Sequence, residues 1–312
     1  MDASTNITYL TLEGHVELEK YRYVYFLICL FVYILIISCN SVVLSVIYTN
    51  KCLHEPMYIF IAALLCNSLC GATAFYPKLL IDFLSEKQYV SFEGCIFQAF
   101  VIYTFGASEF TLLTAMAYDR YVSICKPLQY STLVKMSTVK KLLFLCWFVP
   151  FCEHSITMII TSRLHLCKYK LDRIYCNNYS IVKLSCDDIS INNIYGFFVL
   201  TVAVFPPMIF IIFTYAQILT VCLKNSKDFR NKALQTCFPH LFIFITFTVT
   251  SCFEVINSRF DNNVPHIFSM IMSVENEIIS PLINPVIYGF KVQDIWSRIK
   301  KMVRRKKANI FY

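Results

Sequence analysis

The residues best suited to chemistry in this sequence are a few charged side chains within long apolar stretches. Asp119 and Arg120 are neighbours at the end of one stretch, Glu109 lies ten residues earlier, and Glu275 and Glu277 interrupt another. A charge in an apolar environment is costly unless it faces a partner or a water-filled cleft. These residues could therefore bind an ion or proton, attract a charged ligand or operate a switch. The Asp119–Arg120 pair could equally be an interface pair whose long side chain reaches water.

The motifs of nucleotide-driven and hydrolytic enzymes are missing from the sequence. Only six glycines occur, and no two are close enough to form a phosphate-binding loop. No Gly-x-Ser-x-Gly or His-Glu-x-x-His sequence occurs, and the six histidines do not cluster as metal ligands. We therefore expect neither an enzyme nor a bound metal or cofactor.

The elements that must position the charged residues are membrane helices. Of the 312 residues, 57% are hydrophobic and only 15% are charged, and the mean hydropathy is +0.57. These values belong to membrane proteins, in which about 20 apolar residues cross about 30 Å of hydrocarbon. We expect an all-α membrane protein with a seven-transmembrane helix bundle over 23–290, an outer arm over 1–22 and a tail over 291–312. The predicted spans are approximately 23–48, 57–80, 95–120, 142–161, 194–223, 233–257 and 264–290.

The distribution of charge orients the bundle. Of the 28 Lys and Arg residues, 18 fall on one side of the predicted spans with only four acids. The positive-inside rule places this side in the cytosol and the amino terminus outside the plasma membrane. No nucleic-acid partner is expected, because the basic residues lie at helix ends. In the tail, Val292, Trp296 and Ile299 alternate with basic residues, which predicts a short amphipathic cytoplasmic helix against anionic membrane lipids.

Four motifs, in order along nearly the whole chain, resemble those of the odorant receptors, a branch of the rhodopsin-like G-protein-coupled receptors. Met116–Tyr130 resembles the end of their third helix, and His54–Tyr58 resembles their first inner loop. Lys232–Leu241 is similar to the start of their sixth helix, and Pro281–Tyr288 to the motif of the seventh. Ser68 and the Glu55-Pro56 pair resemble the residues at these positions in fish members of the family.

This resemblance implies that the chain binds a small organic odorant within the bundle and activates a heterotrimeric G protein of the stimulatory olfactory type. Cyclic AMP would rise in the cilia of sensory neurons. Arg120 would be held by Asp119 at rest and freed to meet the G protein. The residues implied in coupling and activation are Asp119, Arg120, Tyr121, Tyr215, Asn284, Pro285 and Tyr288.

The resemblance also implies a ligand cavity among the third, fifth, sixth and seventh spans. Its expected walls are Ile102, Tyr103, Gly106, Ala107, Val199, Ala203, Ser251, Cys252 and Val255. The first four share one helical face, a spacing that an ordinary packed face fits equally well. The mostly apolar set indicates a small, partly polar molecule, whereas Glu275 and Glu277 could instead attract an amine.

The sequence departs from the wider rhodopsin-like pattern at two places. Ser68 stands where most members carry an aspartate, and Glu109 is a possible substitute, either as an ion or proton site or within a structural polar network with Asn40. Phe247–Thr250 replaces the usual aromatic-and-proline switch of the sixth helix. The activation switch is therefore expected to differ.

Four of the 15 cysteines, Cys95, Cys167, Cys176 and Cys186, fall on the predicted outer side, where three pairings are possible. The resemblance favours Cys95–Cys176 and Cys167–Cys186. Glycosylation sequons occur on the same side at Asn6 and Asn178.

Two alternatives remain beside the odorant receptor. A receptor with the same coupling could respond to a non-olfactory signal. A secondary transporter could use Glu109, Glu275 and Glu277 as a cation path, but the internal repeat typical of transporters is missing.

Overall fold

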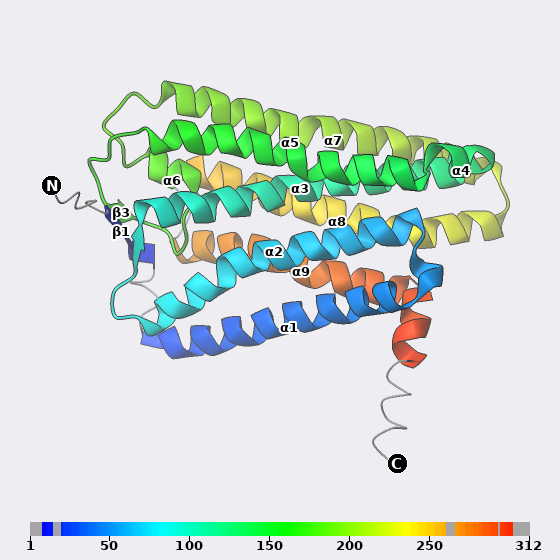
Figure 1. Cartoon of the computed structure of the whole chain (residues 1–312), viewed down its shortest axis with the longest axis horizontal. Coiled ribbons are helices and arrows are strands. Elements are labelled where there is room, and N and C mark those ends of the chain that lie inside the picture. Colours follow the sequence, from blue (N-terminus) through cyan, green and yellow to red (C-terminus); the bar gives the residue numbers. More distant parts are fainter. Residues whose placement is uncertain (1–7, 15–19, 260–265, 293, 302–312) are drawn as a thin grey trace, which may run out of the picture.

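A computed structural model describes residues 8–14, 20–259, 266–292 and 294–301. Long helices lie side by side in one bundle, with the strands at one end and residues 294–301 at the other (Figure 1). The long helices are α1 (Arg22–Thr49), α2 (Pro56–Leu84), α3 (Phe92–Cys125), α5 (Met136–Ser162), α7 (Ser190–Lys224), α8 (Lys227–Arg259) and α9 (His266–Lys291). The short helical turns are η2 (Lys51–Leu53), η3 (Pro127–Gln129), α4 (Tyr130–Leu133) and α6 (Asn178–Val182).

Six helices of the described chain, α1, α2, α3, α5, α7 and α8, are long and apolar enough to cross a membrane. Large apolar side chains such as Phe31, Phe148 and Ile209 point outward and are exposed. In a bilayer these faces meet lipid, and the helix satisfies its own backbone hydrogen bonds there. The expectation of a helical membrane bundle is confirmed.

The helices extend beyond the apolar stretches that mark them in the sequence. α3 continues to Cys125, five residues past Arg120, and α7 and α8 are separated only by Asn225 and Ser226. Hydropathy locates the part of a helix that lies in lipid, whereas hydrogen bonding continues the helix into water. Residues 224–232, which the predicted spans leave between the fifth and sixth helices, are thus largely helical. Pro206 and Pro207 also lie within one continuous helix, α7.

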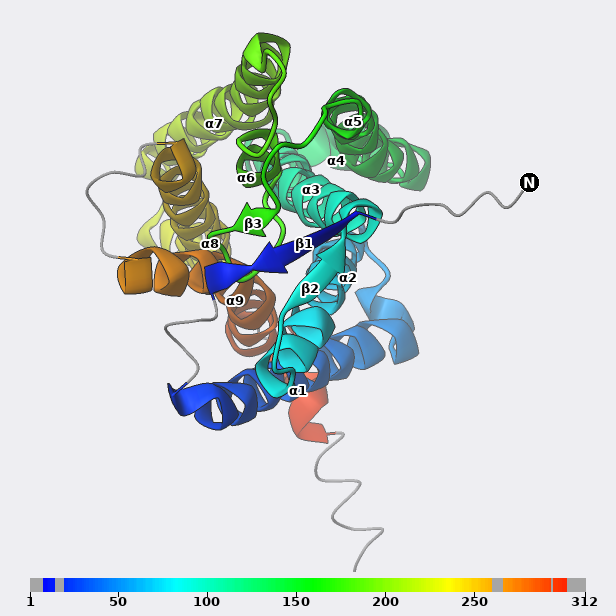
Figure 2. The ribbon, with the colours of Figure 1, turned by 90° about the vertical axis from the view of Figure 1, so that its left-hand side faces the viewer.

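A small outer sheet was not foreseen from the sequence. β1 (Tyr9–Leu12) pairs antiparallel with β2 (Tyr89–Ser91) and parallel with β3 (Lys170–Leu171). The sheet lies across the outer end of the bundle, as Figure 2 shows. Leu10 and Leu12 are fully buried beneath it. Leu10 and Leu12 alternate with Tyr9 and Thr11, which is the period of a strand. This short pattern was overlooked because the outer arm as a whole is polar.

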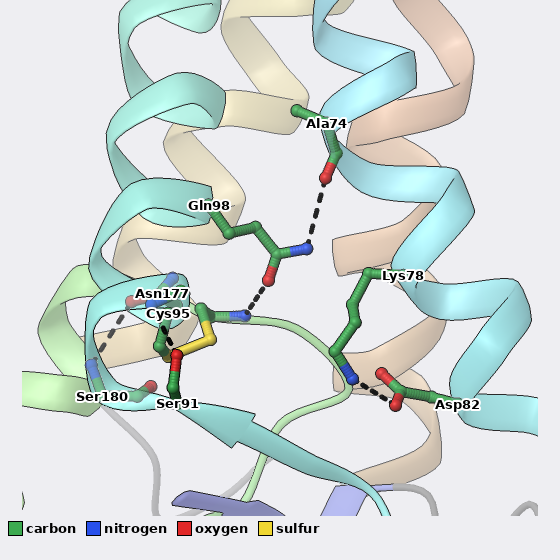
Figure 3. Close-up of a disulfide and its surroundings, with 10 residues drawn as sticks. Ala74, Lys78, Asp82, Ser91, Cys95, Gln98, Asn177 and Ser180 are labelled. Atoms are coloured by element: carbon green, nitrogen blue, oxygen red, sulfur yellow. Dashed lines mark hydrogen bonds and ion pairs between the residues drawn. A yellow bond between two sulfur atoms is a disulfide. The ribbon is translucent and has the colours of Figure 1, made fainter. Parts of the chain in front are cut away.

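One disulfide anchors this outer layer to α3, and a second lies within it. Cys95, in the first turn of α3, bonds to Cys176, and Cys167 bonds to Cys186 within the loop between α5 and α7. Beside the first disulfide, the Gln98 side chain accepts a hydrogen bond from the Cys176 amide at 3.1 Å and donates one to the Ala74 carbonyl on α2 (Figure 3). One glutamine therefore joins α2, α3 and the loop.

At the inner end, residues 294–301 form a helix that packs on the bundle. Ile295 is fully buried, and Asp294 accepts a hydrogen bond of 2.7 Å from the Tyr58 hydroxyl on α2. Arg298 donates to the Asn50 side chain at 3.2 Å, next to the first inner turn. The amphipathic pattern of the tail therefore serves packing against the protein on one face.

Candidate functional site

A cavity of about 190 Å³ lies in the outer half of the bundle. α3, α5, α6, α7, α8 and α9 all contribute to its walls, together with the loop that carries Tyr175. All nine residues expected to form a ligand site line this one cavity: Ile102, Tyr103, Gly106, Ala107, Val199, Ala203, Ser251, Cys252 and Val255. Three separate helices thus bring the nine together, a convergence that helical periodicity alone does not produce.

Gly106 leaves space in the wall of the cavity. A Cβ atom built on Gly106 would meet no heavy atom within 4 Å. The floor below it is aromatic, because the Phe110 ring lies 4.8 Å from the Phe247 ring between α3 and α8. A ligand in this space would therefore touch helices on both sides of the bundle.

The sequence reading missed most of the polar groups in the walls. His154 on α5 is buried, stacks on Tyr103 at 5.8 Å between ring centres, and has an Nε2 with no hydrogen-bond partner in the described part of the protein. On the same side, the Thr161 hydroxyl donates to the Asn178 side chain at 2.9 Å and accepts from Asn192 at 3.3 Å. For His154 and Thr161, a polar residue within the predicted span 142–161 was the signal that could have identified them.

Two carboxylates form another part of the wall. Glu254 comes from α8 and Glu277 from α9, and both line the cavity. Glu277 was singled out in the sequence, whereas Glu254 was not, although it is an acid within a predicted span. The side chain of Glu275 lies outside the described residues. The Tyr175 hydroxyl donates to Glu254 at 3.0 Å.

Below the cavity, Glu109 joins a polar cluster of three helices. Its carboxylate accepts hydrogen bonds from the Ser280 hydroxyl and from the Asn284 amide, the latter at 2.9 Å. The Asn284 amide also donates to Ser68 on α2 at 3.2 Å. All four side chains are buried. Asn40 lies outside this cluster and donates instead to the Ile36 and Pro281 carbonyls, each at 2.8 Å.

The expected ion pair between Asp119 and Arg120 does not occur among the described residues. Asp119 is buried and accepts a hydrogen bond of 2.7 Å from the Tyr130 hydroxyl of α4. Arg120, the next residue along the helix, forms no described salt bridge with Asp119, and its charge acts on Asp119, Tyr215 and Tyr288. Because adjacent residues of a helix do not face one another, a partner from the inner loop takes the place of the arginine.

Tyr215 and His240 link three helices near the inner end. The Tyr215 hydroxyl lies 2.8 Å from Nδ1 of His240, and Nε2 of His240 lies 2.8 Å from the Leu113 carbonyl on α3. A carbonyl only accepts, so Nε2 carries the proton and Nδ1 accepts from the tyrosine. His240, in the motif Lys232–Leu241 of α8, therefore connects α7 to α3.

The other residues expected in coupling lie around the same inner half. Tyr121 packs beside Phe213, with 6.4 Å between ring centres, and Lys126 lies over its face. Pro285 is within α9, and the buried Tyr288 hydroxyl has no hydrogen-bond partner among the described residues.

The two glycosylation sequons fall in different settings. Asn6 lies outside the described residues. Asn178 begins α6, is only partly exposed and lines the cavity, with its side chain bonded to Thr161. A glycan attached to Asn178 would have to pass through this wall of the cavity. Glycosylation of Asn178 therefore remains a prediction, and the folded geometry does not favour it.

Comparison with known proteins gives a consistent result. The sequence family described as "Olfactory receptor" matches residues 28–306. Olfactory receptor 10K2 of Homo sapiens is 33% identical over 297 residues, which cover 94% of this chain and 94% of that protein. Olfactory receptor 4B13 of Mus musculus is 30% identical over 312 residues, covering 98% and 99%. Olfactory receptor 6Y1 of Homo sapiens is 30% identical over 305 residues, covering 97% and 93%.

Motifs, helical bundle and relatives all agree over nearly the full length. The chain therefore belongs to the olfactory receptor family, and it is an odorant-sensing, G-protein-coupled receptor of the plasma membrane rather than an enzyme.

Proposed function

We propose that the outer cavity is the odorant site of this receptor. The observation that carries the proposal is the convergence of nine family-implied residues from α3, α7 and α8 on one cavity. Pockets for small molecules are typically concave and mostly apolar, with a few convergent polar groups. The walls of this cavity are mostly apolar and also carry His154 and two carboxylates, so they fit that description.

The ligand would act by preferring one arrangement of the bundle over another. A ligand shifts such an equilibrium only by the difference between its affinities for the two states. Here it would touch Phe110 and Phe247, whose rings join α3 to α8 just above the Glu109 cluster. Movement of α8 against α3 would then reach the Tyr215–His240 bridge and Arg120 at the inner end.

At the inner face, we propose coupling to a stimulatory olfactory G protein and a rise in cyclic AMP. Arg120, lying near Tyr215 and Tyr288, is placed to change partners when the inner ends of α7, α8 and α9 move. The exposed Lys300 and Lys301 of the tail helix would rest on anionic lipid of the inner leaflet.

A substitution that fills the cavity tests the site. The Cβ atom of Gly106→Leu meets no heavy atom within 4 Å, and Gly106 lines the cavity, so we expect normal folding and surface expression but loss of the odorant-dependent cyclic AMP rise. The matched control is Thr201→Leu, on the exposed face of α7, which should keep the response. Arg120→Ala should bind odorant but fail to signal. A full response from well-expressed Gly106→Leu would contradict the proposed site.

A further inference from the structure

Two neutral polar side chains of α5 lie in the wall of the outer cavity. His154 and Thr157 both line the cavity, and residues three apart are neighbours on one face of a helix. His154 is only 7% exposed, and the Tyr103 ring of α3 stacks on it with 5.8 Å between ring centres. The stacking holds the plane of the imidazole at the edge of the cavity.

The buried imidazole of His154 lacks a hydrogen bond. Its Nε2 has no hydrogen-bond partner in the part of the chain that the structure describes. An unpaired nitrogen in an apolar interior costs free energy, and buried polar groups of native proteins nearly always have a partner. A polar ligand in the cavity that His154 lines can supply the missing partner.

The hydroxyl of Thr157 is restricted to accepting hydrogen bonds from a ligand. It donates its own proton to the Glu153 carbonyl, one turn earlier on α5, at 3.1 Å. A hydroxyl has one proton and two acceptor lone pairs, so Thr157 can only accept from the cavity, whereas a neutral imidazole has one N–H to donate. Together the two side chains match a ligand group that donates one hydrogen bond and accepts another.

Other polar groups of the cavity wall are engaged with protein partners. Asn178 accepts a hydrogen bond of 2.9 Å from Thr161, which accepts one of 3.3 Å from Asn192. Glu254 accepts a hydrogen bond of 3.0 Å from Tyr175. These contacts position α6 and the outer loop. The two α5 residues differ, because the imidazole Nε2 has no described partner and the threonine hydroxyl keeps acceptor positions.

We infer that the ligand is a neutral aliphatic alcohol, whose hydroxyl donates to Thr157 and accepts from the His154 imidazole. A ketone of the same carbon skeleton only accepts, so it leaves Thr157 without a donor. The carbon chain of the alcohol contacts the apolar wall that includes Ala107, Val199 and Ala203. This inference rests on the proposed function, because it assigns a chemical class to the ligand of the same cavity.

Binding can be measured without signalling, using the purified full-length receptor in lipid nanodiscs. The probes are the secondary alcohols from pentan-2-ol to octan-2-ol, each compared with the ketone of the same carbon skeleton. We expect at least one alcohol to raise the melting temperature at a concentration about fivefold below that of its ketone, the ratio that one neutral hydrogen bond gives.

Two substitutions test the two hydrogen bonds separately. Thr157→Val removes the acceptor at nearly constant shape, so it should raise the alcohol concentration needed by about fivefold and abolish the preference over the ketone. His154→Phe keeps a flat ring against Tyr103 without any nitrogen, and should raise the alcohol concentration by a similar factor. His154→Gln restores a side-chain donor and should bind the alcohol more tightly than His154→Phe, which provides a second variant at this position.

The matched control for the threonine is Thr220→Val on α7. Thr220 makes the same kind of bond, to the Ala216 carbonyl at 2.9 Å, and is not among the described residues that line the cavity. Its alcohol response should equal that of the parent chain. Gly106→Leu fills the cavity and should abolish stabilisation by the alcohol and the ketone alike.

These outcomes separate the alcohol inference from the proposed odorant site. Equal binding of alcohols and ketones, or an alcohol response unchanged in Thr157→Val or in His154→Phe, overturns the alcohol inference while the cavity remains the odorant site. Lack of stabilisation by any of the four alcohols also overturns it. An alcohol response that persists in Gly106→Leu contradicts the proposed site itself.

Discussion

At the scale of single residues, buried polar atoms connect the helices of this receptor. Asn284 donates to both Glu109 and Ser68, so one amide of α9 holds α3 and α2. In a low-dielectric interior such bonds are strong, and leaving a donor unpaired there costs about 1–3 kcal/mol. A small displacement of one of these three helices would therefore alter the hydrogen bonds of the other two.

Glu109→Leu should lower the thermal stability of the receptor. The change leaves the Ser280 and Asn284 donors without their acceptor in a buried site, at a cost of about 1–3 kcal/mol. Glu109→Gln keeps one acceptor oxygen and should cost less. The measurement is the melting temperature of the purified receptor in nanodiscs.

Thr104→Val on the same helix is the control for this change. The Thr104 hydroxyl is buried and has no hydrogen-bond partner in the described part of the chain, so its removal should be neutral or stabilising. If Thr104→Val destabilised the receptor more than Glu109→Leu, the structural role assigned to the cluster would be wrong.

At the scale of elements, the inner helix over residues 294–301 is held by polar and apolar contacts with the bundle. Tyr58 on α2 reaches Asp294, Arg298 reaches Asn50, and Ile295 provides the buried anchor. A short helix in isolation is only marginally stable, so tertiary contacts must stabilise it.

Tyr58→Phe should loosen this helix without unfolding the bundle. A hydrogen bond to a charged group is worth about 1.5–3 kcal/mol, so amide hydrogen exchange in residues 294–301 should accelerate roughly tenfold or more. Hydrogen–deuterium exchange with mass spectrometry measures this directly. Exchange in α3 serves as the internal reference, and an equal acceleration there would mean global destabilisation instead.

At the scale of the whole molecule, the outer layer is a covalently fastened cap. β1 crosses the mouth of the bundle between β2 and β3, and the Cys95–Cys176 disulfide joins α3 to the loop whose Tyr175 lines the cavity (Figures 2 and 3). The position of the cavity therefore depends on the correct folding of segments that are far apart in the sequence.

Removing the two disulfides should have unequal effects. Cys95 and Cys176 are 81 residues apart and fully buried, whereas Cys167 and Cys186 are 19 apart and exposed. Loop-closure entropy gives about 4.5 kcal/mol for the longer loop and about 3 kcal/mol for the shorter. Paired serine substitutions should thus reduce surface expression and melting temperature more for the first pair. The reverse order would contradict the anchoring role given to it.

The sequence by itself determined the membrane class and orientation of the chain. The length of each apolar stretch and the distribution of basic residues are properties of local composition. They determine insertion into the bilayer and orientation without any contribution from tertiary contacts. Family motifs then supplied the residues of the outer cavity and the inner coupling region. β1 was missed because four alternating residues are a weak signal that only pairing with distant strands makes decisive.

Tertiary structure decided which residues meet. Asp119 accepts a hydrogen bond from Tyr130, a contact that depends on the position of a segment that hydropathy does not describe. Glu254 was not singled out in the sequence. It becomes a candidate site residue only because it lines the same cavity as Glu277 and accepts a hydrogen bond from Tyr175. The physical reason is that the sequence determines which side chains are charged, whereas the free energy of a buried charge depends on the groups around it. Those groups are brought together only by tertiary packing.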